Sequence, residues 1–296
     1  MARILITGTT GMLGTYVLSD LQKFDHDIVI GDRARFDLDL PLQMYEGILN
    51  VAPDVIVHLA AETDVDLCER VPMHAGVRNH LATDMVAKAA RECGAWILYM
   101  STSNVFGYGR GLVYTEIDIP NPENYYGRSK LMGELAIRMH CPTNHMIVRG
   151  GWMIGGGLVG DHKFVGKILR QMQAGQTKIR AVQDKFGSIT SAKALSEFIV
   201  WAVANRPTGT VHFASKGMVT RCDIARAIGG EIGFSGEVDG VSSPEFPLSA
   251  PRPMSEAIES IYMPLLDGAP QPGHWKDDLV CYVRDLLVQQ QGTSAC

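Results

Sequence analysis

The chain lacks long apolar runs, cysteine motifs and an excess of positive charge. No apolar run approaches the roughly 18 residues of a membrane span, and Met1 leads directly into a strand-like segment, so we expect neither a transmembrane helix nor a signal peptide. The six cysteines contain no C-x-x-C pair, and the nine histidines lack metal-ligand spacing. We therefore expect a cytoplasmic protein with reduced cysteines and no metal site. The net charge of -5 predicts that neither nucleic acid nor membranes are partners.

Strand-like and helix-like segments alternate over the first half of the chain. Short apolar runs predict buried strands, and two intervening segments at 79–93 and 123–140 have helical patterns. This order is typical of an α/β fold of the Rossmann type, with a doubly wound parallel sheet covered by helices on both faces. The predicted strands span residues 2–7, 27–31, 54–59, 95–100 and 145–148.

The composition changes near residue 150. Glycines become frequent there, and prolines recur after residue 231, but no linker or internal repeat divides the chain. We expect residues 1–150 to form a dinucleotide-binding domain, completed by parts of 175–230. Residues 151–296 are expected to form mainly a smaller substrate-binding lobe, with the substrate in the cleft between the two.

A glycine-rich turn follows the first predicted strand. Gly8, Gly11 and Gly14 run directly into a helical pattern, which is the context of a dinucleotide site. Free N–H groups at the helix start would receive the pyrophosphate of the cofactor. Asp32, at the end of the second strand, favours NADH by bonding the adenine ribose, whereas Arg33 favours NADPH by binding its 2′-phosphate. The expected cofactor is therefore NAD(H) or NADP(H).

A tyrosine and a lysine share one face of the predicted helix at 123–140. Tyr126 and Lys130 are four residues apart, so they lie one turn from each other. A lysine ammonium favours the phenolate, and we expect it to lower the pKa of Tyr126 from about 10. Tyr126 would then exchange a proton near neutral pH. Thr102, after the fourth strand, is placed to bond a substrate carbonyl oxygen, with Ser101 and Ser103 as rivals.

Seven segments in the same order carry a resemblance to a known family. They are residues 6–14, 31–39, 58–66, 101–106, 125–134, 185–192 and 252–255. In these segments the chain resembles the dTDP-4-dehydrorhamnose reductase family of extended short-chain dehydrogenases. The resemblance implies an NAD(P)H-dependent reductase of a nucleotide-linked 4-keto-6-deoxy sugar. In this reaction hydride reaches C4 and Tyr126 donates the proton.

The resemblance also implies roles for individual residues. Thr102, Tyr126 and Lys130 fall on the catalytic Thr/Ser–Tyr–Lys triad, and Tyr126 and Lys130 also contact the cofactor. Trp152 borders the nucleotide-sugar pocket, and we expect Ser103 and Asn104, which follow the catalytic threonine, to bind the substrate as well. The further cofactor-binding residues are Gly8, Gly11, Met12, Leu13, Gly14, Asp37, Leu38, Ala60 and Ala61.

Two cations at a predicted helix start add a candidate anion site. His162 and Lys163 precede the helical pattern near 163–173, and a helix start with cations suits a pyrophosphate. An exposed basic helix end is the alternative.

Two other functions and one assembly stay open. A nucleotide-sugar epimerase with tightly bound NAD uses the same triad, and some relatives on this fold are non-catalytic, nucleotide-binding regulatory subunits. The segment Arg149-Gly-Gly-Trp152 differs from the usual Arg-Thr-Ser-Trp of the family, which leaves the sugar and the nucleotide undetermined. Helix pairs in this superfamily often form dimers, so a homodimer is possible.

Overall fold

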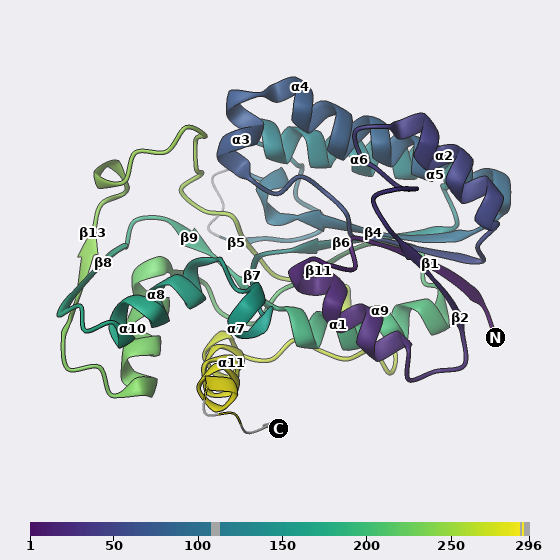
Figure 1. Ribbon diagram of the computed structural model, residues 1–296. Helices are drawn as coiled ribbons and strands as arrows, with labels where there is room; N and C mark the ends of the chain where they lie inside the picture. Colours follow the sequence, from purple (N-terminus) through teal and green to yellow (C-terminus); the bar gives the residue numbers. More distant parts are fainter. Residues whose placement is uncertain (108–112, 291, 293–296) are drawn as a thin grey trace.

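The five predicted strands lie in one sheet with a sixth strand from later in the chain (Figure 1). The computed structural model describes residues 1–107, 113–290 and 292. The sheet order is β11-β6-β4-β3-β1-β2, and all neighbouring strands in it are parallel. The predicted Rossmann-type fold is therefore confirmed. The strands are β1 (Arg3–Thr7), β2 (Asp27–Gly31), β3 (Val55–His58), β4 (Trp96–Thr102), β6 (His145–Gly150) and β11 (Gly209–Phe213).

Helices cover both faces of this sheet, as Figure 1 shows. One face carries α1 (Met12–Leu21) and α9 (Ala192–Asn205). The other face carries α2 (Pro41–Val51), α5 (Ala82–Cys93) and α6 (Tyr125–His140). Between β3 and α5 the chain forms α3 (Val65–Arg70), α4 (Pro72–Ala75) and a π-helical turn (Gly76–Leu81).

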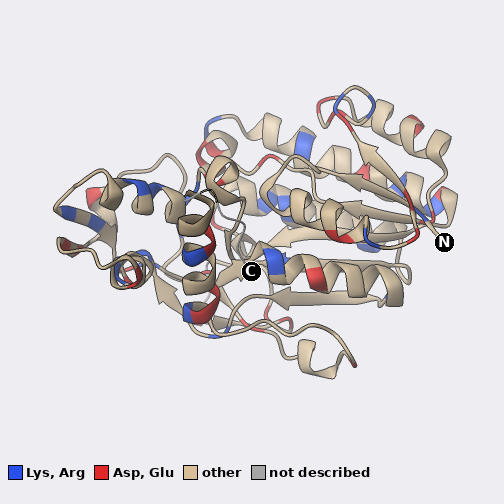
Figure 2. Ribbon diagram, turned by 60° about the horizontal axis from the view of Figure 1, so that its bottom comes forward, with Lys and Arg blue, Asp and Glu red and all other residues tan. Residues whose placement is uncertain are grey.

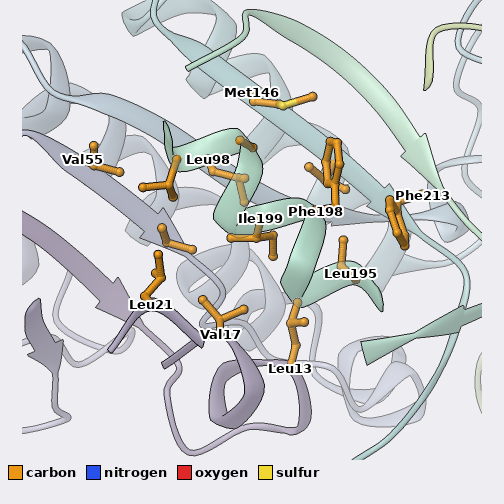
Figure 3. Packing of buried hydrophobic residues seen from close by; sticks show 14 of the residues in the cluster. Leu13, Val17, Leu21, Val55, Leu98, Met146, Leu195, Phe198, Ile199 and Phe213 are labelled. Atoms are coloured by element: carbon orange, nitrogen blue, oxygen red, sulfur yellow. The ribbon is translucent and has the colours of Figure 1, made fainter. Parts of the chain in front are cut away.

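The strands read as continuous apolar runs because both sides of the sheet are buried. In β1, Ile4 and Ile6 face the core beneath α1 and α9, whereas Leu5 faces the core beneath α2 and α5. All three side chains are fully buried. Figure 3 shows the first of these cores, where Val17 of α1 and Phe198 of α9 lie against strand residues such as Leu98. This packing fixes the strand ends, and the strand ends position the site.

A second lobe packs around a separate apolar core, at the left in Figure 1. Its core draws on α8 (Phe164–Gln173), α10 (Arg221–Ile232) and α11 (Trp275–Gln290). The parallel strands β7 (Trp152–Ile154) and β10 (Ile189–Ser191) connect it to the sheet region. The other elements are β5 (Val113–Tyr114), α7 (Gly157–Gly160), β8 (Lys178–Val182), β9 (Phe186–Gly187), β12 (Val219–Thr220), β13 (Glu237–Val241), β14 (Ala257–Ile258) and 3₁₀ turns at Ser103–Val105, Ser243–Glu245 and Met263–Leu265.

The division into domains stays an interpretation, but the order of elements bears on it. α9 and β11 follow the first elements of the second lobe and yet pack with the sheet. Residues 192–213 thus belong structurally with the first 150 residues.

The charge distribution, the cysteines and the hydropathy of the helices add little to the search for a functional site. Figure 2 shows acidic and basic residues interspersed along both lobes. The five described cysteines are free thiols, and Cys296 lies outside the described residues. Across residues 1–107, 113–290 and 292, no helix has the length and apolar character needed to cross a membrane. In the same residues no group of three His, Cys, Asp or Glu side chains is placed to hold a metal ion.

Candidate active site

A cavity of about 860 Å³ lies where the parallel strands end. Its wall includes Gly8 after β1, Asp32 after β2, Ala60 after β3 and Thr102 at the end of β4. The chain leaves β1 for β2 on one side and returns to β3 on the other, so the order of strands reverses between β1 and β3. Ligands of doubly wound sheets bind at this reversal, outside the carboxyl ends of the strands.

The glycine loop forms one wall of this cavity. Gly8 has a φ of +76°, a conformation that favours glycine. A side chain on Gly14 would collide with the backbone of Gly8 and Thr9. α1 begins after Gly11 with no side-chain cap and no acidic residue in its first turn. The N–H groups of its first turn are therefore available to an anion. The glycine loop and this first turn together form a cradle that fits the diphosphate of a dinucleotide.

The residues after β2 form a second part of the wall. Among them, Asp32 and Arg33 differ in their contacts. Asp32 accepts hydrogen bonds from the backbone N–H of Arg35 (3.1 Å) and from its side-chain Nε (3.1 Å) and Nη2 (3.0 Å). Arg35 accordingly holds the pKa of Asp32 below its usual value. Arg33 lines the cavity but makes no hydrogen bond or ion pair with any described residue. Asp32 is thus paired with a cation, whereas Arg33 is not paired with an anion among the described residues.

The turn after β4 distinguishes the three hydroxyl rivals. Ser101 donates to the carboxylate of Glu134 at 2.7 Å, and Ser103 donates to that of Glu256 at 3.0 Å. Thr102 lines the cavity, where its Oγ1 accepts the N–H of Asn104 at 3.2 Å and its side chain hydrogen-bonds Tyr126. The hydroxyl of Thr102, unlike those of Ser101 and Ser103, is therefore not bound to a carboxylate.

α6 positions the tyrosine and the lysine. Asn124 caps this helix by accepting the N–H of Gly127 at 2.8 Å, and its amide donates to Asn104 Oδ1 at 3.1 Å. The cap thus ties the helix start to the turn that carries Thr102. Tyr126 and Lys130 both line the cavity, where they are 9% and 2% exposed.

The expected lowering of the Tyr126 pKa is wrong for this structure. Burial raises the pKa of Tyr126 to about 12, and a hydrogen bond with Thr102 offsets only part of that rise. Burial also lowers the pKa of Lys130 to about 7, because its ammonium is removed from water. The Lys130 Nζ lies 4.1 Å from the ring centroid of Tyr99. Spacing along the helix places both groups on the cavity wall, but burial dominates the pKa of each.

Glu134 extends the series of Tyr126 and Lys130 by one further turn of α6. Its carboxylate is fully buried and accepts Arg149 Nε at 2.8 Å and Nη2 at 2.7 Å. These bonds hold the pKa of Glu134 below its usual value despite its burial, and its charge in turn raises the pKa of Lys130. A buried anion therefore supports the charged form of the lysine.

Glu256 links the second lobe to the turn that carries Thr102. Its carboxylate accepts Trp152 Nε1 at 2.7 Å, as well as bonds from Ser103 and the Asn104 amide. The sequence carries no signal for this role, because Glu256 only follows the segment 252–255 in the chain. Its contacts form through folding alone.

Most predicted site residues reach the cavity, although their roles stay predictions. Ser103 and His162 do not line it: Ser103 is bound to Glu256, and His162 is exposed. The predicted residues that line it are Gly8, Gly11, Met12, Leu13, Gly14, Asp32, Arg33, Asp37, Leu38, Ala60, Ala61, Thr102, Asn104, Tyr126, Lys130, Trp152 and Lys163. Lining residues that sequence reasoning missed include Thr9, Thr63, Arg78, Met153, Phe164 and Arg221.

Known proteins share both the sequence and the fold of this chain. The dTDP-4-dehydrorhamnose reductase from Yersinia enterocolitica is 56% identical with a TM-score of 0.95, covering 97% of this chain and 100% of that one. The enzyme of that name from Bacillus anthracis, solved in complex with NADP, is 29% identical with a TM-score of 0.89, covering 96% and 99%. The dTDP-4-dehydrorhamnose reductase of Mycobacterium tuberculosis strain H37Rv is 32% identical, covering 94% of this chain and 91% of its own length.

The match to a family model covers nearly the whole chain. Residues 2–288 match the model described as RmlD substrate binding domain. The resemblance predicted from the seven segments is confirmed by this match and by the relatives. The chain therefore belongs to the RmlD substrate binding domain family, together with the dTDP-4-dehydrorhamnose reductases that it resembles.

Proposed function

We propose that this protein is an NADPH-preferring reductase of a nucleotide-linked 4-keto-6-deoxy sugar. The observation that carries the proposal is that one cavity joins the glycine loop to Thr102, Tyr126 and Lys130. The relatives named dTDP-4-dehydrorhamnose reductase supply the substrate class. NADP in the Bacillus anthracis structure supports the cofactor.

Three side chains of the cavity divide the chemistry between them. When bound, the reduced nicotinamide supplies the hydride that the keto carbon accepts. Thr102 holds the keto oxygen, and Tyr126 donates a proton to it as negative charge develops. Burial raises the pKa of Tyr126 to about 12, so the phenol carries its proton at neutral pH, as it does at its ordinary pKa, and it needs the charge of Lys130 to release that proton. Lys130, when charged, stabilises the phenolate that remains.

The preference for NADPH follows from the two residues after β2. Arg35 already engages both oxygens of the Asp32 carboxylate, which weakens that carboxylate as an acceptor for ribose hydroxyls. Arg33 is unpaired among the described residues and lies on the same wall. Arg33 acts on Asp39 only through its charge, without a hydrogen bond. A 2′-phosphate would give Arg33 a directly bound anion, and Arg–phosphate pairs are among the stronger charge-assisted contacts.

The test is nicotinamide oxidation that depends on a sugar substrate. Purified protein is mixed with NADPH or NADH and with dTDP-4-dehydrorhamnose, and the loss of nicotinamide absorbance is followed. We expect oxidation that requires the sugar, that is faster with NADPH at low cofactor concentration, and that is at least about 100-fold slower in the Tyr126→Phe variant. Bound NAD that survives dialysis, without net oxidation, would favour the epimerase instead. Failure to bind either cofactor would favour a regulatory subunit.

A further inference from the structure

Arg221 places a cation on the cavity wall in the second lobe. It is the first residue of α10, and its guanidinium carbon lies 3.8 Å from the ring centroid of Trp152 and 5.0 Å from that of Phe164. All three residues line the cavity. Within the described part of the chain, Arg221 makes no hydrogen bond or ion pair. Stacking on two aromatic rings holds the guanidinium plane and leaves its N–H donors to a ligand.

The surrounding charges give this cation no directly bound partner among the described residues. Glu256 is the carboxylate that acts on it, but Glu256 already accepts bonds from Trp152, Ser103 and Asn104. Arg252, the second charge that acts on it, has the same sign as Arg221. A largely buried charge without a direct partner costs free energy, and an anionic ligand removes that cost.

A second cation lies on the same wall. Lys163 precedes α8, a helix of ten residues that begins with no side-chain cap. The cofactor diphosphate has its own cradle at Gly8, Gly11 and Gly14, on the sheet side of the cavity. An anion held by the second lobe is therefore best assigned to the other ligand, the substrate.

We propose that Arg221, together with Lys163, binds the diphosphate of the nucleotide sugar and so fixes where the sugar lies relative to Tyr126. The identification of this anion as part of the substrate rests on the proposed function. The stacked guanidinium offers two parallel donors to phosphate oxygens, which a lysine cannot reproduce. Arg221 is accordingly a specificity-determining residue for a diphosphate over an uncharged ligand.

The experiment measures ligand binding to protein that is saturated with NADP⁺, so that the cofactor cradle is filled. Calorimetric titrations with dTDP, thymidine and inorganic diphosphate compare the wild type with Arg221→Gln and Arg221→Lys. We expect Arg221→Gln to weaken dTDP binding about 10- to 100-fold and thymidine binding less than about twofold. Arg221→Lys should lie between the wild type and Arg221→Gln for dTDP. The matched control is Arg226→Gln, which removes an exposed cation from the same helix and should leave the affinities for dTDP and thymidine unchanged.

The outcomes separate this proposal from the proposed function. Equal weakening of dTDP and thymidine, or no weakening of dTDP, would overturn the role of Arg221 in binding the diphosphate. If the wild type binds inorganic diphosphate in an Arg221-dependent way but not dTDP, the anion site stands and the proposed nucleotide is wrong. If it binds none of the three ligands, both proposals fail. NADP⁺ affinity and circular dichroism verify that Arg221→Gln is folded. If it is not folded, the dTDP and thymidine affinities of Arg221→Lys test the role of Arg221 instead.

Discussion

Replacing Lys130 with methionine should stabilise the protein while abolishing its activity. Lys130 is 2% exposed, and burial lowers its pKa from 10.5 to about 7. Folding therefore has a free-energy cost at this lysine whenever the pH lies below its unfolded pKa, either to bury the charged amine or to remove its proton. Methionine has a similar length and no charge, so it removes this cost without opening a large void.

The magnitude follows from the two pKa values. Each unit by which folding lowers the pKa of the lysine corresponds to about 1.4 kcal/mol. At pH 7, Lys130 therefore lowers the free energy of unfolding by about 4 kcal/mol. The variant also loses the contact of the ammonium with the Tyr99 ring, worth about 1–2 kcal/mol when desolvated. The net expectation is a gain of about 2–3 kcal/mol.

The stability difference between the wild type and Lys130→Met should depend on pH. Between pH 7 and pH 10.5 the unfolded chain binds the lysine proton more strongly than the folded protein does, so the wild type gains stability as the pH rises. The advantage of Lys130→Met should be complete below pH 7 and should shrink towards pH 10.5.

Urea unfolding of the wild type and Lys130→Met at pH 7 and pH 9.5 measures this difference. Lys276→Met, at an exposed position of α11, serves as the control and should lie within about 0.5 kcal/mol of the wild type. A variant less stable than the wild type at pH 7, or an advantage independent of pH, would refute the reasoning.

Three further predictions concern the chemistry of the cavity. Tyr126→Phe should lower kcat about 10²- to 10⁴-fold without changing NADPH affinity in a fluorescence titration, and full activity would exclude Tyr126 as the acid. Arg33→Ala should raise the Kd of NADPH about 10- to 100-fold and leave that of NADH unchanged, whereas equal weakening would contradict the 2′-phosphate assignment. The wild-type kcat should fall as the pH rises through about 7, where Lys130 loses its charge. Glu134→Gln should move that limb of the pH–rate profile to lower pH, because the Glu134 carboxylate raises the pKa of Lys130; an unmoved limb would show that Glu134 has no such effect.

The sequence was most informative where burial and local geometry coincide. The strand at 27–31 was predicted with its observed bounds, because a short apolar run ends at a glycine and an aspartate. Tyr126 and Lys130 were placed on one helix face by their spacing alone. The glycine loop was predicted by the glycines that its backbone requires. In each case neighbours along the chain determine the result.

The errors arise where distant segments determine the result. Spacing predicted that Lys130 would lower the pKa of Tyr126, but the burial of both groups by the rest of the fold outweighs that pairing. Ser103 follows Thr102 directly, and yet its hydroxyl donates a hydrogen bond to Glu256, which is 153 residues away in the chain. Arg221 has no motif of its own, although Thr220 and Asp223 form the capping box that starts its helix. Its position on the cavity wall depends on how α10 packs in the second lobe.

Burial in one wall of the cavity shifts the pKa values of both Tyr126 and Lys130. The burial that raises the pKa of Tyr126 also makes the charged form of Lys130 unfavourable, since both groups lie in the same water-poor wall. Glu134 can moderate the second effect without undoing the first, because its charge raises the pKa of Lys130 while its own burial is compensated by Arg149. A variant that relieved the burial would stabilise the lysine charge and would return the pKa of Tyr126 towards its ordinary value. The stability of the fold and the charge that Lys130 offers to the phenolate are thus opposed at this site, and Lys130→Met tests that opposition because it removes the charge and should raise the free energy of unfolding.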